Sequence, residues 1–227
     1  MKLYIGNKNY SSWSMRPWVM LKNAGIAFEE IKLRFDSFAP GSQFRQSIAS
    51  VSPVGKVPVL VDGDVTVWDT LAIAEYVAES FPEKQLWPAD PAQRARARSI
   101  CAEMHSGFAN LRGACMMNIE ASLPDIGALA LRDKPAVVAD VRRIEAIWGE
   151  LLSAHGGPYL FGERFTIADA FYAPVCMRFK TYALSNQAQI QAYVEAIRSA
   201  PGVKDWIADA LVEGDFLDFE EPHRLKR

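Results

Sequence analysis

Up to about residue 80, short apolar runs rich in β-branched residues alternate with segments of helical period. The strand-like runs are Lys2 to Ile5, Phe28 to Leu33, Val57 to Val61 and Val65 to Trp68, and the helical segments run from about Met15 to Asn23 and from Thr70 to Ser80. The turn Asp62-Gly63-Asp64 is typical of a β-hairpin, so we expect the two strands beside it to be antiparallel. The order β-α-β followed by β-β-α predicts a small α/β domain over residues 1–80.

The pattern changes at a proline-rich stretch over residues 81–91, which we interpret as a linker. Residues 92–227 show helical period only. Apolar positions recur at helical spacing from Ile100 to Leu111 and from Val141 to Leu152, and further helices are expected at about Ile167 to Ala183, Ala188 to Ser199 and Val203 to Val212. Thr166 and Asp169 have the spacing of a capping box, so we assign Asp169 a structural role. The sequence therefore predicts an α/β domain followed by an all-helical one.

Composition and charge argue against some classes of binding partner. Half of the 227 residues are apolar, and a net charge of −2 comes from interleaved acidic and basic side chains. The absence of a charged block argues against nucleic acid or an anionic membrane as the main partner. The N-terminus lacks the apolar stretch of a signal peptide. The three cysteines lack metal-ligand spacing, so we expect reduced thiols, no metal and a cytoplasmic location.

The first candidate binding feature is the run from Ser52 to Leu60, which contains Gly55-Lys56-Val57-Pro58, followed by Asp69-Thr70 at the start of a helix. A strand that begins with Val57-Pro58 offers backbone groups to an extended ligand, because proline is confined to a strand's start or edge. Free N–H groups at the following helix start attract a carboxylate. Each feature alone is common at the ends of structural elements, but together they favour a small peptide-like ligand.

The second candidate feature is the segment from Asn9 to Pro17, where three serines meet the start of the first helix. We expect Ser14 to be the N-cap, which leaves Ser11 and Ser12 without a structural role. A serine hydroxyl at the positive end of a helix can donate a hydrogen bond to an anionic sulfur and favour thiolate over thiol. A serine hydrolase is disfavoured, because the only histidines, His105, His155 and His223, are distant in sequence.

Three sequence motifs together resemble the serine-using glutathione S-transferases, and the zeta class in particular. They are Ser-Ser-x-Ser-x-Arg after the first strand, Ser-Pro-x-Gly-Lys-Val-Pro-Val-Leu, and Asp-Thr-Leu-Ala-Ile-Ala-Glu-Tyr, all between residues 3 and 80. The C-terminal part matches more loosely, through its helical pattern and the segment from Phe165 to Asp169.

This resemblance implies a thioredoxin-like N-terminal domain, an all-helical C-terminal domain and glutathione bound between them. Within the glutathione site it implies a cis Pro58, pairing of Val57 with the cysteinyl part, and contacts from Asp69 and Thr70 to the γ-glutamyl end. It further implies contacts near the glycyl end from Gln43 and Lys56, and orientation of the sulfur by Ser11 or Ser12. The zeta register favours Ser11, whereas counting back from Arg16 favours Ser12. Trp13 would be either a wall of the cleft or a direct contact.

The electrophile should bind against the helical domain. Candidates at spacings of four are Met104, Phe108, Arg112 and Met116, and a later helix adds Arg178 and Tyr182. Such an apolar stripe is more often core, but an arginine that continues it requires a partner or an anionic ligand.

The predicted function is a glutathione transferase of the detoxification kind, which conjugates glutathione to a small hydrophobic electrophile or uses it to reduce a hydroperoxide. Alternatives are a zeta-like isomerase, a dehalogenase and a non-catalytic binding module. Trp13 occupies the position where maleylacetoacetate isomerases of the zeta class carry a cysteine, which argues against the isomerase hypothesis. The resemblance also implies a homodimer.

Overall fold

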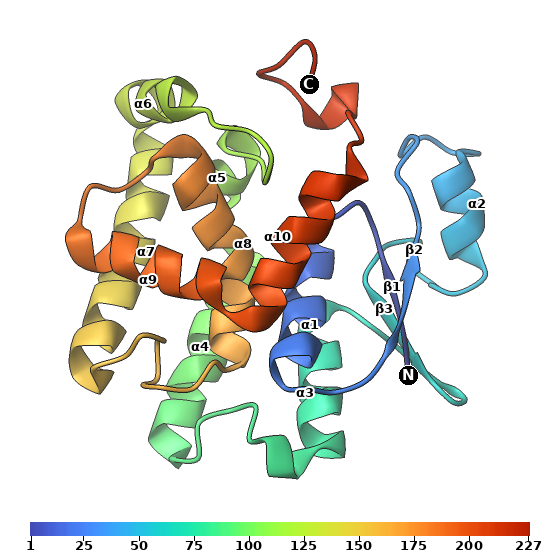
Figure 1. Cartoon of the computed structure of the whole chain (residues 1–227), viewed down its shortest axis with the longest axis horizontal. Helices are drawn as coiled ribbons and strands as arrows, with labels where there is room; N and C mark the ends of the chain where they lie inside the picture. The colour runs from blue at the N-terminus through green and yellow to red at the C-terminus, as the bar shows by residue number, and fades with distance from the viewer.

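A four-stranded sheet in the order β2-β1-β3-β4 forms the first part of the molecule. The computed structural model describes residues 1–227, and the strands are β1 (Lys2–Ile5), β2 (Glu29–Lys32), β3 (Val59–Asp62) and β4 (Val65–Trp68). Strand β1 runs parallel to β2 and antiparallel to β3, which pairs with β4 as a hairpin. Three helices accompany the sheet: α1 (Ser12–Asn23), α2 (Gln43–Ala49) and α3 (Thr70–Ser80). Helices α1 and α3 lie between the sheet and the rest of the molecule, and α2 lies on the far side (Figure 1).

The second part of the molecule is helical. Its α-helices are α4 (Pro91–Ser106), α5 (Ala109–Ala114), α6 (Pro124–Asp133), α7 (Pro135–His155), α8 (Ile167–Tyr182), α9 (Ala188–Ser199) and α10 (Pro201–Glu213). Short 3₁₀ helices occur at η1 (Pro82–Lys84) and η2 (Asp218–Glu220). None of the helices combines the length and apolar character needed to cross a membrane. The predicted fold class, a thioredoxin-like domain followed by an all-helical domain, is confirmed.

Helix α8 is the centre of the helical part. All of its residues except Lys180 are buried, and it packs against α1, α4 and α9. Because α1 belongs to the α/β part, one hydrophobic core runs through both parts and includes Trp18, Trp148 and Trp206. Burial of such large aromatic side chains contributes strongly to stability, and it fixes the position of α1 relative to α8.

The start of α8 is held by the predicted capping box. The carboxylate of Asp169 accepts hydrogen bonds from Thr166 N at 2.8 Å, Thr166 Oγ1 at 2.9 Å, Leu160 N at 3.0 Å and Tyr193 Oη at 3.2 Å. Burial raises the pKa of Asp169 to about 6, although these hydrogen bonds oppose the increase. A fully buried carboxyl group with this many donors has a structural role, as the sequence predicted.

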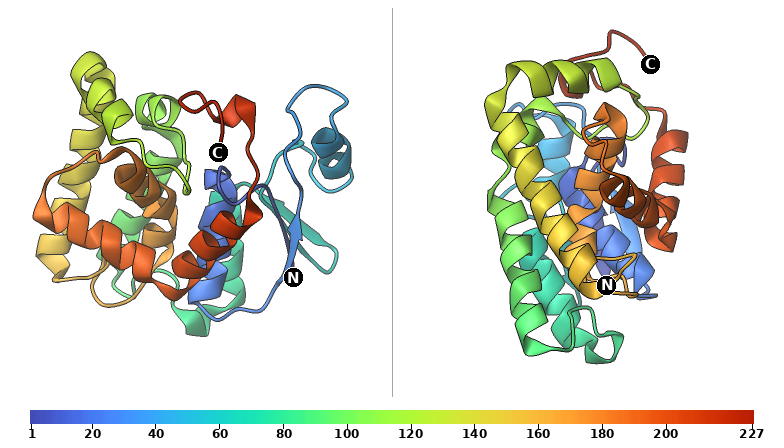
Figure 2. Two further views of the ribbon diagram at one scale, coloured as in Figure 1. Left: turned by 45° about the horizontal axis from the view of Figure 1, so that its top comes forward. Right: turned by 90° about the vertical axis from the view of Figure 1, so that its left-hand side faces the viewer.

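Beyond α10, the C-terminal segment, defined as residues 214–227, leaves the helical part and returns over the α/β part. Figure 2 shows it, in red, standing between the helices and α2. Leu217 packs against a small second core formed by Phe35, Phe44, Ile48 and Val59 beneath α2. The segment therefore contacts elements that are far apart in the sequence.

Several elements begin or end where the apolar pattern predicted. The strands Lys2–Ile5 and Val65–Trp68, the antiparallel hairpin and the helices Thr70–Ser80 and Ala188–Ser199 agree with prediction. Helices α2 and α6 were not predicted; each is short and buries only two residues.

Two local predictions were wrong. Helix α1 begins at Ser12, so Ser11 and not Ser14 occupies the N-cap position. Ser14 lies inside the helix, where its Oγ accepts a hydrogen bond from Gly6 N at 3.1 Å. The helical spacing from Ile100 to Leu111 also does not belong to one helix, because Phe108 adopts a left-handed φ of 55° between α4 and α5.

Candidate active site

Two adjoining chambers lie between the α/β part and the helical part. The main chamber has a volume of about 510 Å³ and the side chamber about 450 Å³. Trp13, Lys56 and Val57 line both of them. Trp13 therefore stands at the boundary between the chambers, which join along the loop that contains Lys56 and Val57.

The predicted serines meet at the start of α1, but their hydroxyl groups have different surroundings. Ser11 is buried, and its hydroxyl donates a hydrogen bond to Ser14 Oγ at 2.7 Å. Ser12 is half-buried and accepts a hydrogen bond from Arg178 Nη2 at 3.4 Å. The hydroxyl hydrogen of Ser12 is thus free to be donated into the main chamber, whereas that of Ser11 is engaged inside the protein.

Arg112 and Arg178 bring positive charge to the helical wall of the main chamber. Arg178 is oriented by backbone carbonyls, because its Nε donates to Cys115 O at 2.9 Å and its Nη1 to Pro174 O at 3.1 Å. Burial lowers the pKa of Arg178 to about 10, and the charge of Arg112 contributes to the decrease. Neither guanidinium forms a salt bridge with a carboxylate, so an anion in the chamber would offset the cost of burying their charges.

A third arginine, Arg16, packs against the ring of Trp13. The guanidinium of Arg16 lies 4.2 Å from the centre of the Trp13 ring, and its Nη1 is 3.5 Å from Thr70 Oγ1. The Nε of Arg16 has no hydrogen-bond partner, and burial, with the charges of Arg178 and Arg112, lowers its pKa to about 9. This buried and nearly unpaired cation makes the whole region attractive to anions.

The side chamber contains Asp69 and Thr70 where α3 begins. Asp69 adopts a φ of 74°, and its Oδ1 accepts a hydrogen bond from Leu71 N at 2.9 Å. A positive φ is uncommon outside glycine, and such positions are often held in place at functional sites. The Oδ2 atom of Asp69 lies 3.2 Å from Nε2 of His105, a residue of α4.

The loop before β3 presents the backbone of Val57 to both chambers. The Val57–Pro58 peptide bond is cis, as the resemblance implied. Neither the N–H nor the carbonyl group of Val57 forms a hydrogen bond within the chain. The neighbouring carbonyl of Gly55 accepts a hydrogen bond from Arg45 Nη1 at 3.0 Å, which ties this loop to α2. An extended ligand could therefore pair with Val57 as with the edge of a sheet.

Most of the site residues predicted from the sequence line the two chambers. They are Ser11, Ser12, Trp13, Lys56, Val57, Arg112, Met116 and Arg178 in the main chamber, and Pro58, Asp69 and Thr70 in the side chamber. Gln43 is exposed and lines neither chamber, although Phe44 and Arg45 of the same helix line the main one. Met104 and Phe108 are buried in the hydrophobic core, and Tyr182 is buried with its Oη donating to Met116 O at 3.0 Å.

Tyr10 and Arg45 of the main chamber were not predicted, and neither were two titratable residues from beyond residue 80. His105 lines the side chamber, where its ring packs edge-on against Trp13 at 5.1 Å between centroids. Burial lowers its pKa, and the charge of Asp69 opposes this decrease. Glu220 lines the main chamber from the C-terminal segment. No local motif marks either residue, because each reaches the cleft only through the packing of the helical part.

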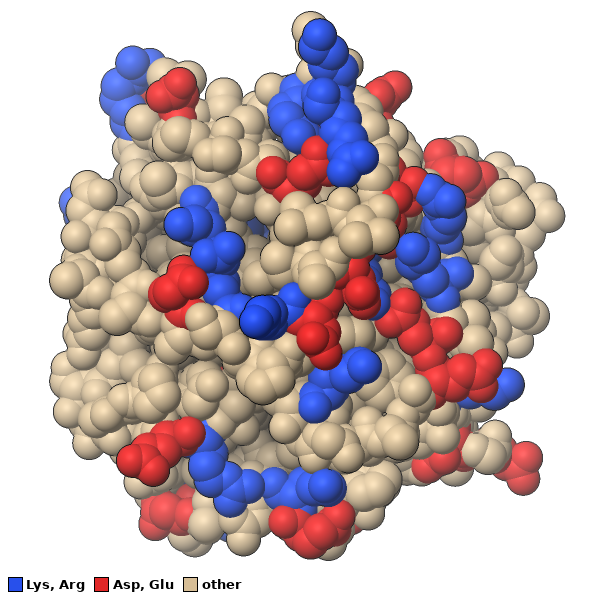
Figure 3. All heavy atoms as spheres, viewed as in Figure 1, with Lys and Arg blue, Asp and Glu red and all other residues tan.

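Charges on the face seen in Figure 3 are interspersed, with no large area of one sign. The excess of positive charge is instead inside the cleft, where Arg45, Lys56, Arg112 and Arg178 line the main chamber with Glu220 as their one acidic neighbour. The arrangement can bind an extended anionic ligand along Val57, with a hydroxyl donor and guanidinium groups at one end.

Family models match both parts of the chain. Residues 10–80 match the glutathione S-transferase N-terminal domain, and residues 91–209 match the glutathione S-transferase C-terminal domain.

Similar proteins cover most of the chain. The chain is 30% identical to a probable maleylacetoacetate isomerase of Caenorhabditis elegans over 76% of each protein. It is 28% identical to a zeta-class glutathione S-transferase of Euphorbia esula, over 76% of this chain and 74% of that protein. A solved structure of a Burkholderia glutathione transferase homolog with bound glutathione matches with a TM-score of 0.69 and 24% identity, over 93% of this chain and 98% of that one. The structural likeness supports the fold.

Proposed function

Because this chain belongs to the glutathione S-transferase family and is zeta-like, we propose that it binds glutathione in the cleft and transfers it to a small electrophile that carries a carboxylate. The hydroxyl of Ser12 stabilises the glutathione thiolate in this proposal. The observation that carries it is the free hydroxyl hydrogen of Ser12 in a chamber lined by Arg112 and Arg178.

Ser12 is favoured over Ser11 as the thiolate donor. Ser12 is the first residue of α1, so it lies at the positive end of the helix, and Arg178 donates to its oxygen at 3.4 Å. A hydroxyl group that accepts from a guanidinium is polarised toward donating its own hydrogen. Ser11, by contrast, is oriented toward Ser14 and supports the loop.

Glutathione would occupy both chambers. Its γ-glutamyl end fits the side chamber, where the free N–H groups at the start of α3 favour a carboxylate and Asp69 offers an acceptor to the amine. Its cysteinyl part would pair with the backbone of Val57, and its glycyl carboxylate would lie near Lys56. The thiol would then point toward Ser12 in the main chamber.

The electrophile would bind between the thiol and the helical wall. Arg112 and Arg178 can hold a carboxylate, and Met116 and Met117 supply apolar contact for the rest of the molecule. The chain contributes position and electrostatic stabilisation, while glutathione supplies the nucleophile. In a substitution the sulfur bonds to the electrophilic carbon, and the leaving group departs with the electron pair of the broken bond. In an addition to a double bond, the electron pair of that double bond is protonated.

The test is the pKa of the thiol of bound glutathione, measured by thiolate absorbance during a pH titration. Ser12→Ala should raise this pKa by about 1 to 2, since a hydrogen bond to a charged group contributes about 1.5–3 kcal/mol. Ser11→Ala is the matched control, because it removes an equivalent hydroxyl that faces Ser14 and should leave the thiol pKa unchanged. An unchanged value in both variants and in the double variant would refute the thiolate role of these serines.

Isomerisation of a cis-dienoic acid is the second candidate activity. The arginine pair in the main chamber favours it, and so does the similarity to a probable maleylacetoacetate isomerase. Incubation with maleylacetoacetate and with an acidic aryl halide would distinguish isomerase from conjugation activity. Turnover of cumene hydroperoxide would show a glutathione-dependent peroxidase, and absence of all three would favour a non-catalytic binding protein.

A homodimer completes the proposal, with the small domain of one subunit against the helices of the other. Light scattering coupled to gel filtration would measure a mass of about twice the monomer, and a monomeric mass would contradict this part of the proposal.

A further inference from the structure

The C-terminal segment brings a carboxyl group into the main chamber. Glu220, the last residue of η2, is half-buried and lines this chamber together with Ser12, Arg112 and Arg178. It is the only acidic side chain among the residues that line the chamber. The proposed chemistry does not use it, which raises the question of why an acid is held among these cations.

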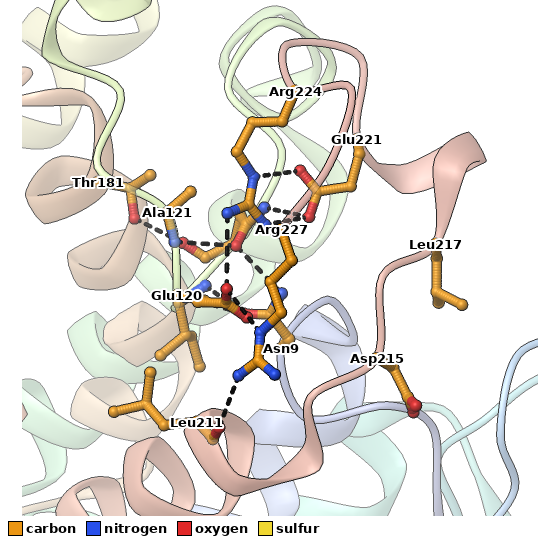
Figure 4. A network of polar contacts seen from close by, with 12 residues as sticks. Asn9, Glu120, Ala121, Thr181, Leu211, Asp215, Leu217, Glu221, Arg224 and Arg227 are labelled. Atoms are coloured by element: carbon orange, nitrogen blue, oxygen red, sulfur yellow. Dashed lines mark hydrogen bonds and ion pairs between the residues drawn. The ribbon is translucent and has the colours of Figure 1, made fainter.

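The position of Glu220 is fixed on the helical side by its neighbour Glu221. Figure 4 shows Glu221 beside Arg224 in a network of polar contacts. Its carboxylate accepts hydrogen bonds from Tyr10 Oη at 2.7 Å, Asn118 Nδ2 at 2.8 Å and Arg224 Nε at 2.8 Å. Arg227, farther along the segment, donates from Nε to Glu120 at 2.9 Å. This part of the segment is thereby attached to the loop between α5 and α6.

The segment is also attached to the α/β part. The ring of Phe219 packs edge-on against Phe38 at 5.2 Å between centroids, and Asp215 accepts a hydrogen bond from Asn7 Nδ2 and pairs with Arg34. Contacts on both sides of the cleft therefore hold Glu220 over the main chamber.

The charges around Glu220 come from several elements. Arg178 belongs to α8, Arg112 to α5, Arg45 to α2, Lys56 and Tyr10 to loops, and Glu221 to its own segment. Burial raises the pKa of Glu220 to about 7; Arg178 opposes this increase and Glu221 adds to it. Burial also raises the pKa of Tyr10 to about 12 and that of Cys115, which faces Arg178, to about 11. Among these groups, Glu220 is the one placed to change charge near neutral pH.

We propose that Glu220 is a specificity-determining residue, whose carboxyl group opposes acidic electrophiles when ionised and admits them when protonated. The inference deepens the proposed function and rests on it. Ionised Glu220 neutralises part of the charge of Arg178 and repels a ligand carboxylate. Protonated Glu220 leaves both arginines available and can donate a hydrogen bond to that carboxylate.

The test compares two ligands that differ by one carboxylate, S-benzylglutathione and S-(p-carboxybenzyl)glutathione. Their dissociation constants are measured by calorimetry at about pH 6 and about pH 8, and the ratio of the two constants is the readout. Neither ligand has a free thiol, so ionisation of sulfur cannot contribute. Effects of His105 on the γ-glutamyl end act on both ligands and cancel in the ratio.

In the wild-type protein the relative affinity for the acidic ligand should fall about tenfold between the two pH values, because one proton bound with a pKa of about 7 is linked to binding. In Glu220→Gln, which keeps the size of the side chain, the ratio should not vary with pH and should equal the wild-type value at the lower pH. Glu163→Gln, at an exposed position that lines neither chamber, should behave like the wild type.

Three outcomes would overturn the inference. A wild-type ratio that does not change with pH would show that Glu220 does not select on charge. A ratio that changes equally in Glu220→Gln would assign the effect to another group. Failure of the neutral ligand to bind at either pH would overturn the proposed glutathione site itself, and the inference with it.

Discussion

The two walls of the cleft are built in different ways. The wall from the α/β part presents Ser12, Val57, Asp69 and Thr70, which lie at the start of a helix or in the loop before a strand, within residues 1–80. Its functional groups include backbone atoms as well as side chains. The opposite wall presents long side chains from three separate segments: Arg112 and Arg178 from two helices of the helical part, and Glu220 from the C-terminal segment.

This difference shows how one fold can retain the binding site for one ligand while the site for a second substrate changes. The first wall is specified by backbone geometry, so changing its ligand would require changing the ends of its structural elements. The second wall is specified by side chains that project from well-packed helices, so single substitutions can change its charge and shape while the scaffold persists. His105 departs from this division, because it belongs to α4 but lies beside Asp69, on the side where we propose that glutathione binds.

The largest effect should come from Asp169→Ala, which tests whether the helical wall depends on its scaffold. The substitution leaves Leu160 N, Thr166 N and the Tyr193 hydroxyl without their buried acceptor. We expect the free energy of unfolding to fall by about 3–5 kcal/mol, since each unpaired buried donor costs about 1–3 kcal/mol.

Urea unfolding followed by tryptophan fluorescence measures this change. Asp125→Ala is the control, because Asp125 also lies in the first turn of a helix but is exposed, and it should change stability by less than about 0.5 kcal/mol. Equal effects of the two substitutions would contradict the structural role of the capping box.

Arg178→Met should weaken the binding of acidic electrophiles at the helical wall and leave the opposite wall nearly unaffected. We expect the KM for an acidic electrophile to rise about 10- to 100-fold, because a hydrogen-bonded charge pair contributes about 1.5–3 kcal/mol. The KM for glutathione should change much less. Arg178→Lys should recover part of the loss for the acidic electrophile, and an equal loss for a neutral electrophile would indicate that Arg178 acts mainly on Ser12 or on folding.

Thr70→Val should weaken the glutathione side alone. Removal of the hydroxyl that lies 3.5 Å from both Arg16 Nη1 and His105 Nδ1 keeps the side-chain shape but loses a polar contact in the side chamber. We expect the dissociation constant of reduced glutathione to rise about tenfold, as for one hydrogen bond to a charged group. Calorimetry measures it, with the exposed Thr66→Val in β4 as the control. Wild-type affinity in Thr70→Val would place the γ-glutamyl end elsewhere.

The smallest effect should come from His105→Gln. This substitution tests the one residue that belongs to the helical part but lies beside Asp69 on the opposite wall. The partly exposed contact between His105 and Asp69 contributes at most about 1 kcal/mol, so glutathione affinity should fall less than about fivefold. The burial that lowers the pKa of His105 keeps it neutral near physiological pH, so the effect should grow only as the solution is acidified. A loss larger than that of Thr70→Val would make His105 a principal part of the glutathione site.

Features of this molecule could be predicted from the sequence where they depend on residues that are close together in the chain. The hairpin at Gly63 and the capping box at Thr166 follow from neighbours within a few residues, whereas the placement of Ser12, Val57 and Thr70 in one cleft was implied only by the family resemblance. The position of Ser14 was misjudged, because the competing partner of its hydroxyl is Gly6, eight residues away in the preceding strand. The core positions of Met104 and Phe108 were offered as pocket residues because helical spacing does not say which face of a helix meets a cleft.

The sequence by itself determined the order of the strands, the division into α/β and helical parts, and the family, because these depend on periodicity and short motifs. Only the tertiary structure decided which of Ser11 and Ser12 has a free hydroxyl, and that Arg112, Arg178 and Glu220 share one chamber. The physical reason is that hydrogen-bond partners and charge neighbours are set by packing between distant segments. Glu220 reaches the chamber because contacts on both sides of the cleft hold the C-terminal segment, and no local pattern encodes that position.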